Sequence, residues 1–218
     1  LKADGSVVTW GYGPAGGNSG AVSNQLNGDI DVVQVYSNSS AFAALRADGS
    51  VITWGNADTG GNSSSVAAAL NGAVDVSQVY STTSAFAALR ADGSVVTWGN
   101  PGTGGERGPV ADQLNGANDV IKIYSTMSSF AALRSDGSVV TWGYDQFGGD
   151  SSAVAAQLSG AIDVVDIATT GSAFAAIRKD GSVVTWGNEL DGGNSSAVAN
   201  ALNGSIDVAS IHATTSAF

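Results

Sequence analysis

The sequence contains no cysteine and only one histidine, His212. Without cysteine the chain can form no disulfide, no thiolate zinc site and no cysteine nucleophile. A single histidine leaves little material for a catalytic triad or an imidazole metal site. His212 stands where Tyr36 and Tyr80 stand in equivalent segments, so we interpret it as a structural substitution. We therefore expect that the protein is not an enzyme and has no catalytic, metal-binding or cofactor-binding residue.

Carboxylates are the remaining source of catalytic chemistry, because some glycosidases act with a pair of acids alone. The candidates are Asp58, Glu106, Asp145, Glu189 and Asp191. Their spacing does not favour a catalytic pair over a solvated surface. A carboxylate-based hydrolase is therefore kept only as a remote alternative.

Positive charge is also scarce, with 8 Lys and Arg against 19 Asp and Glu and a net charge of −11. This balance excludes a cationic footprint for nucleic acid and disfavours anionic membranes. No apolar run reaches the roughly 18 residues of a membrane span, so we expect no membrane insertion. We expect an acidic protein that is extracellular or on a bacterial cell surface. The chain begins at Leu1, inside a repeat, which indicates a mature fragment or an excerpt of a longer array.

What the sequence does have is a tandem repeat. A tryptophan recurs every 44 residues, without insertion or deletion, at Trp10, Trp54, Trp98, Trp142 and Trp186. An unbroken long period indicates one supersecondary unit copied in tandem. Residues 1–218 thus form a single tandem-repeat array. Its predicted repeat units are approximately 10–53, 54–97, 98–141, 142–185, and 186–218 plus 1–9.

Each repeat predicts a β-hairpin and a third strand. The runs AFAALR at 85–90 and VVTWG at 95–99 flank an Asp-Gly turn, whose glycine supplies the positive φ that such turns need. The segment SSSVAAALNG at 63–72 fits either a short helical turn or a short outer strand. The third predicted strand occupies 31–37 and its equivalents 75–81, 119–125, 163–169 and 207–213.

The hairpin strands are apolar on both faces, since Phe86 and Ala88 point one way while Ala87 and Leu89 point the other. A sheet buried on both faces needs neighbours on both sides. We therefore predict an all-β fold, a β-propeller of 44-residue repeats with five repeats visible. The repeats form either a closed five-bladed ring or part of a larger ring or array, and a β-solenoid is the alternative. The five tryptophans are the predicted structural anchors, each burying about 150–250 Å².

The copies differ most in the four residues that follow each Trp-Gly pair. These loops all follow the same strand, so they should crowd one rim, where exposed aromatics suit contact with a protein or a glycan. Drift in unconstrained loops is the alternative. The predicted ligand-binding residues on these rim loops are Tyr12, Asn56, Asp58, Asn100, Tyr144, Phe147, Asn188 and Glu189. A second varied patch, at 18–20, 62–64, 106–108 and 150–152, is interpreted as solvated turns.

A ladder of cations precedes the Asp-Gly turns. We expect each stem to pack on its sheet while the charged head pairs with the aspartate two residues later, or with the series of Asp31 and Asp75. The alternative is a ring of cations that binds an anion. The members are Lys2, Arg46, Arg90, Arg134 and Arg178.

The run DGSVVTWGN at 92–100, preceded by SAFAALR at 84–90, resembles the repeat of the regulator-of-chromosome-condensation (RCC1-like) β-propellers. The short period resembles in particular their bacterial branch, typified by β-lactamase inhibitor protein II. The resemblance covers the whole chain and implies a propeller that binds other proteins through loops on one face. The sequence departs from the family's GxxHS step, since 36–42 reads YSNSSAF without histidine, so any role of that histidine does not transfer.

These observations predict a non-catalytic binding scaffold that presents its rim loops to a protein or glycan partner. The alternative is a structural or assembly element, such as an adhesin, a stalk or a filament subunit, for which self-association is expected.

Overall fold

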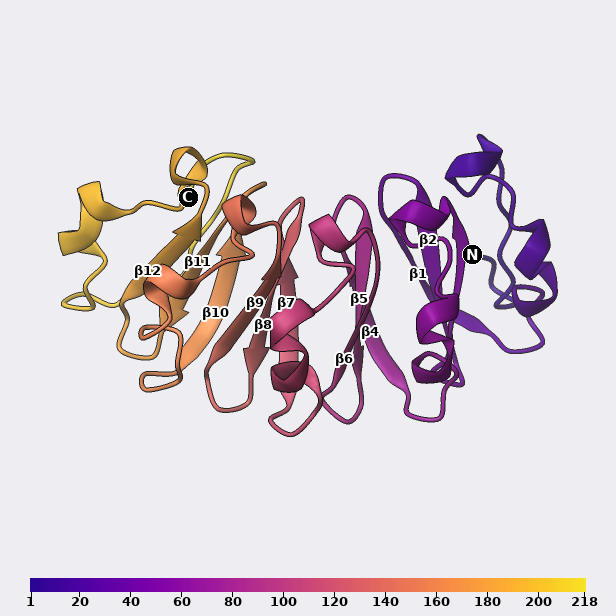
Figure 1. The fold of residues 1–218 in the computed structure, drawn as a ribbon, viewed down its shortest axis with the longest axis horizontal. Helices are drawn as coiled ribbons and strands as arrows, with labels where there is room; N and C mark the ends of the chain where they lie inside the picture. The colour runs from indigo at the N-terminus through magenta and orange to yellow at the C-terminus, as the bar shows by residue number, and fades with distance from the viewer. The chain divides into compact units, whose positions relative to one another are not determined.

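The computed structural model describes residues 1–218, which form short antiparallel strands joined by turns of 3-10 helix (Figure 1). The chain divides into two compact units, Leu1–Glu106 and Arg107–Phe218. Each unit holds two three-stranded sheets. No helix combines the length and the apolar character that crossing a membrane requires.

Every sheet is an antiparallel meander whose middle strand pairs with both neighbours, and in the first sheet Phe42 lies opposite Trp54. The strands of the first unit are β1 (Val32–Ser37), β2 (Ala41–Arg46), β3 (Val51–Gly55), β4 (Val76–Ser81), β5 (Ala85–Arg90) and β6 (Val95–Gly99). Those of the second unit are β7 (Val120–Ser125), β8 (Ser129–Arg134), β9 (Val139–Gly143), β10 (Val164–Thr169), β11 (Ala173–Arg178) and β12 (Val183–Gly187).

The Asp-Gly turn between the second and third strand is built as the sequence predicts. In the first sheet the Arg46 N–H donates to the Ser50 carbonyl over 2.9 Å, and Gly49 has φ 73°. The Asp48 carboxylate accepts from both the backbone N–H and the hydroxyl of Ser50, at 3.1 and 2.6 Å. A Cβ on Gly49 would also lie 2.5 Å from the Asp75 carboxylate. Both the positive φ and the close contact therefore require glycine here.

The segments that fit either a helical turn or an outer strand are 3-10 helices. In the second repeat Leu70 anchors the end of this segment, because its side chain is buried and its carbonyl accepts from the Val51 N–H over 2.9 Å. That anchor leaves room for only a few tight turns of small residues. These helices are η2 (Gly20–Gln25), η4 (Ser64–Ala69), η6 (Gly108–Leu114), η8 (Ser152–Val154) and η10 (Ser196–Ala201).

A stacked pair of Phe and Trp lies at the core of each sheet. Trp54 stacks on Phe42 with ring centroids 5.2 Å apart, and its indole N–H donates to the Gly16 carbonyl over 3.0 Å. The same stack recurs at 5.1–5.3 Å for Phe86–Trp98, Phe130–Trp142 and Phe174–Trp186. The indoles of Trp54, Trp98 and Trp186 are both buried and hydrogen-bonded to a backbone carbonyl, as a buried tryptophan needs to be.

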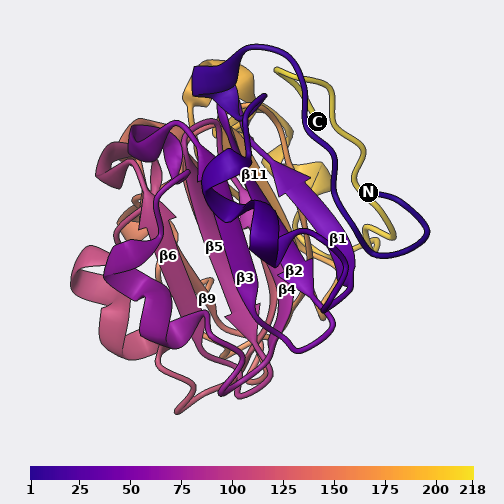
Figure 2. The ribbon, with the colours of Figure 1, turned by 90° about the vertical axis from the view of Figure 1, so that its right-hand side faces the viewer.

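Trp10 does not follow this pattern within residues 1–218, so its role as a structural anchor stays a prediction. It is 84% exposed, whereas the other four tryptophans are at most 5% exposed. The equivalent of Phe42, which stands twelve positions before Trp54, would lie ahead of residue 1. Residues 1–12, indigo in Figure 2, consequently form no strand. The predicted strand at 207–213 is not formed either.

Candidate functional site

The rim loops are single turns of 3-10 helix, and four of the five directly follow the third strand of a sheet. An asparagine opens three of them: the Asn56 side chain accepts from the Asp58 N–H over 2.8 Å, and Asn100 does the same for Gly102 over 2.9 Å. Asn188 accepts from Leu190 over 2.9 Å. These asparagines cap their helices, so the amide oxygen is already used by the backbone. The five turns are η1 (Gly13–Ala15), η3 (Ala57–Thr59), η5 (Pro101–Thr103), η7 (Asp145–Phe147) and η9 (Glu189–Asp191).

Tyr144 and Phe147 are brought together by η7. Their rings meet edge to face, with centroids 5.3 Å apart and an interplanar angle of 83°. Tyr144 remains 44% exposed, so the pair presents an aromatic surface whose orientation is fixed by its own contact. Tyr12, in the first unit, occupies the equivalent position and is 76% exposed.

The remaining predicted rim residues are acidic, and the structure adds an apolar neighbour. Asp58 lies exposed on η3, and Glu189 lies exposed on η9. Leu190, beside Glu189, is 91% exposed. Sequence reasoning missed Leu190, although an apolar residue in a variable loop is a signal that could have found it.

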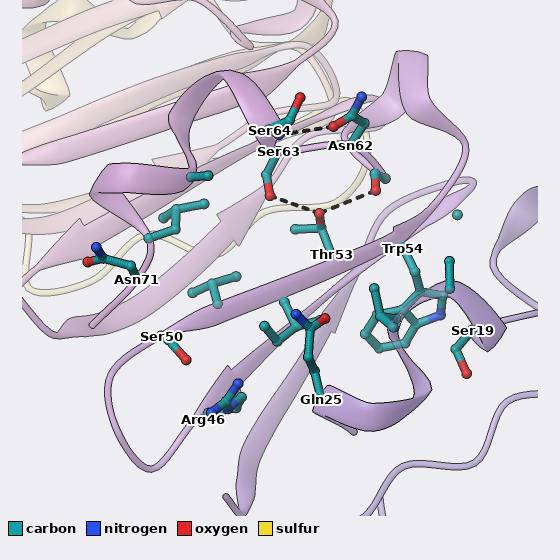
Figure 3. A pocket seen from close by; sticks show the side chains of 18 of the residues that line it. Ser19, Gln25, Arg46, Ser50, Thr53, Trp54, Asn62, Ser63, Ser64 and Asn71 are labelled. Carbon is teal, nitrogen blue, oxygen red and sulfur yellow. Dashed lines mark hydrogen bonds between the residues drawn. The ribbon is translucent and has the colours of Figure 1, made fainter. Parts of the chain in front are cut away.

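A groove of about 660 Å³ runs along β3 in the first unit (Figure 3). The strand forms its floor, and the two 3-10 segments that contain η2 and η4 form its walls. One end of β3 is tied by the bond from Val51 to Leu70 and by a bridge between Ser50 and Asn71. At the centre, the Thr53 hydroxyl donates to Ser63 Oγ over 3.0 Å, which holds one wall against the strand.

The same groove recurs along β12 in the second unit, as two adjoining cavities of about 490 and 380 Å³. Its walls are the segments that contain η8 and η10, and the Thr185 hydroxyl donates to Ser195 Oγ over 3.0 Å. Three carboxylates line the larger of the two cavities, which is called the upper cavity below: Asp145, Asp150 and Glu189. Their counterparts three repeats earlier are Gly13, Asn18 and Ala57, so the groove of the first unit lacks them.

Sequence reasoning did not identify these grooves. The residues at 18–20, 62–64 and 150–152 were expected to form solvated turns, and several of them instead line the walls. A threonine and a serine ten residues apart recur with the repeat, as Thr53 with Ser63 and Thr185 with Ser195. That spacing is a signal that could have pointed to a wall held against a strand.

The cation ladder pairs locally, as predicted. Arg46 contacts Asp48 at 2.9 Å, and Arg178 contacts Asp180 at 3.7 Å. Lys2, Arg90 and Arg134 form the equivalent pairs with the aspartate two residues later. Because these charges pair within their own turns, the structure favours local pairing over a ring of cations.

No protein-family model matches the chain, and no curated protein matches its sequence. Solved structures do share its fold. Yeast RCC1 (Prp20) bound to Kap60 matches 72% of this chain and 43% of its own length, with 17% identity and a TM-score of 0.51. Prp20p from Saccharomyces cerevisiae, in a structure that concerns its binding to Gsp1p and histones, matches 73% and 45%, with 18% identity and a TM-score of 0.51.

The ectodomain of the receptor kinase CR4 from Physcomitrella patens matches 86% of this chain and 46% of its own length, with 16% identity and a TM-score of 0.52. The chain thus spans less than half the length of each of these three proteins. Together with the four antiparallel three-stranded sheets, these matches confirm the predicted fold class. The chain has an all-β, RCC1-like β-propeller fold built from 44-residue repeats.

Proposed function

We propose that the protein is a non-catalytic scaffold that binds another protein through its rim loops. The fold supports this proposal, because the yeast RCC1 (Prp20) that shares it is bound to Kap60 in one structure. The observation that carries the proposal is the aromatic pair of Tyr144 and Phe147 on η7. On the basis of the short period, we further place the chain near the bacterial branch of the RCC1-like propellers.

The physics of the pair suits protein recognition. An aromatic ring offers a large contact area with few rotatable bonds, so ordering it on binding costs little entropy. The edge-to-face contact with Phe147 already restrains the Tyr144 ring, and the hydroxyl remains available as a polar handle. Exposed Leu190 on η9 adds an apolar contact in the same unit.

A selection from a displayed proteome tests this function, with the purified chain as bait. Partners are ranked by their enrichment on the unaltered chain, and their affinities are then measured on the variant Tyr144→Ala/Phe147→Ala. We expect the selected partners to lose at least about 10-fold in affinity, because truncated anchor residues of an interface typically cost 2 kcal/mol or more. Thermal melting should be nearly unchanged, since neither Tyr144 nor Phe147 belongs to the buried core.

The matched control is Val165→Ala, which truncates an exposed apolar residue of β10 in the same unit. This variant should retain the affinity for the partners. Equal losses in the two variants, or no loss in the aromatic variant, would contradict the role of the rim loops. A glycan array probed with the same bait tests the class of partner. Binding to glycans alone would overturn the assignment of a protein partner.

A further inference from the structure

The groove along β12 exposes the edge of a sheet. The Arg178 N–H bonds to the Ser182 carbonyl, and the Asn188 N–H bonds to the Ser172 carbonyl, both over 2.9 Å. Since backbone direction alternates along an antiparallel strand, Val184 and Trp186 also face β11, whereas Thr185 faces outward. The outward N–H and C=O of Thr185 make no backbone hydrogen bond to any segment outside the sheet. Unpaired groups of this kind form a template for an added strand.

The chain itself pairs with this edge beside Thr185, at Val183. The Val183 N–H is taken by the Leu202 carbonyl over 2.9 Å, which fixes the far end of the wall. The Thr185 hydroxyl donates to the Gly193 carbonyl over 3.1 Å and to Ser195 Oγ over 3.0 Å. These bonds hold segment 193–195 against β12 through the Thr185 side chain, and they do not use the Thr185 backbone.

The charge of the groove indicates which chains it accepts. Asp145, Asp150 and Glu189 line the upper cavity, and no Lys or Arg lines it. A hydrogen bond from the Ser152 backbone N–H lowers the pKa of Asp150. This carboxylate therefore stays ionised at lower pH than an ordinary aspartate. Arg178, in the lower cavity, is paired with Asp180 and donates to Ser182 Oγ over 2.8 Å. The unpaired charge in the groove is therefore negative.

We propose that the groove along β12 binds an extended, lysine- or arginine-bearing segment of a partner protein as an additional β-strand. Backbone hydrogen bonds to Thr185 would supply the pairing, and cationic side chains of the segment would meet Asp150 and Glu189. This inference goes beyond the proposed function, because the aromatic pair of Tyr144 and Phe147 does not line the groove.

The first test uses a defined probe, the acetylated and amidated peptide Lys-Thr-Lys-Val-Lys-Thr with a fluorescent label. Fluorescence anisotropy should show saturable binding to the chain, and the counterpart with Glu in place of Lys should bind at least about 10-fold more weakly. Methylation of alternate backbone nitrogens of the Lys peptide should also reduce affinity at least about 10-fold, because it removes strand pairing without removing charge. Undiminished binding of the methylated peptide, or no binding of the Lys peptide, would overturn the proposal.

The second test changes the protein. Asp150→Asn with Glu189→Gln should weaken binding of the Lys peptide at least about 5-fold, and more strongly at low salt. The matched control, Asp29→Asn with Asp112→Asn, removes the same charge from exposed positions outside the groove. An equal loss in the control would reduce the effect to attraction by the net charge of −11 and would refute a specific site.

Binding in the groove and binding through the aromatic pair can be separated by experiment. Tyr144→Ala/Phe147→Ala should leave binding of the Lys peptide unchanged. Weakening of peptide binding in that variant would contradict the groove as an independent site, whatever its effect on a partner selected through the rim loops.

Discussion

At the scale of single residues, the environment of each tryptophan determines its contribution to stability. Trp98 stacks on Phe86 at 5.3 Å and donates to the Gly60 carbonyl over 3.0 Å, and both rings are buried. Gly60 belongs to the same cluster, since a Cβ there would lie 2.7 Å from the Phe86 ring. Trp10 has the same sequence neighbours but none of these contacts.

This difference predicts unequal costs of truncation. Trp98→Ala should lower the free energy of unfolding by about 3–5 kcal/mol, because it removes a buried ring and leaves a cavity. Trp10→Ala should change it by less than about 0.5 kcal/mol, as is usual for exposed positions. Urea unfolding followed by circular dichroism measures both values. Equal costs for the two variants would contradict the packing described for the Phe–Trp stack.

At the scale of elements, each hairpin depends on one backbone conformation. Gly49 lies in the left-handed region at φ 73°, and it contacts the Asp75 segment of the next repeat. The turn thus joins β2 to β3 and also packs against the start of the following repeat. Its geometry is a local requirement with consequences for the neighbouring sheet.

Gly49→Ala should therefore destabilise the protein by at least about 1–2 kcal/mol, the cost of a left-handed alanine, with the collision at Asp75 adding to it. Gly13→Ala is the matched control. Gly13 lies in η1 with an ordinary φ, and an added Cβ would meet only the Asn18 side chain at 3.7 Å. Thermal melting of the two variants measures the difference, and a stable Gly49→Ala protein would show that the turn tolerates another conformation.

At the scale of the whole molecule, the repeated turns make stability depend on acidity. Hydrogen bonds from serine hydroxyls are the largest cause that lowers the pKa of Asp4, Asp92 and Asp180, and the pKa of Asp4 falls from 3.8 to about 2. When the folded pKa lies below the unfolded one, the ionised group favours folding. This contribution is complete above the unfolded value near 3.8 and is lost as the pH falls toward 2.

The free energy of unfolding should thus fall between about pH 4 and pH 2. Ser94→Ala, which removes the hydroxyl that donates to Asp92, should show its largest stability deficit near pH 7 and a smaller deficit at pH 2. Ser77→Ala is the control, because its hydroxyl donates to the Leu89 carbonyl, which does not titrate in this range. Unfolding curves at several pH values provide the measurement. A deficit of Ser94→Ala that does not vary with pH would contradict this linkage.

The sequence predicts those features that depend on contacts within one repeat. The Asp-Gly turn, the three strands and the local pairing of Arg46 with Asp48 follow from residues close together in the chain. The exposure of Trp10 could not be predicted from periodicity, because equivalent positions in the sequence do not guarantee equivalent neighbours in space.

The grooves could not be predicted either. Their floor is the backbone of β3 or β12, which carries no signature in the side chains. Their walls come from two successive repeats, so that Asn18 and Asn62 meet on one groove although they belong to different copies. The rim residues were found because they vary, but variation alone did not distinguish the capping Asn56 from the aromatic pair on η7.

A receptor whose floor is main chain offers the same donors and acceptors whatever amino acids surround it. Selectivity then depends on the side chains of the groove walls. These differ between the two units, although the strand at the floor is the same: Asn18 lines one groove and Asp150 lines the other. Duplication followed by a few replacements at such positions yields docking sites with distinct preferences at no cost to the hydrophobic interior. The same logic makes this chain a practical starting point for engineered peptide receptors.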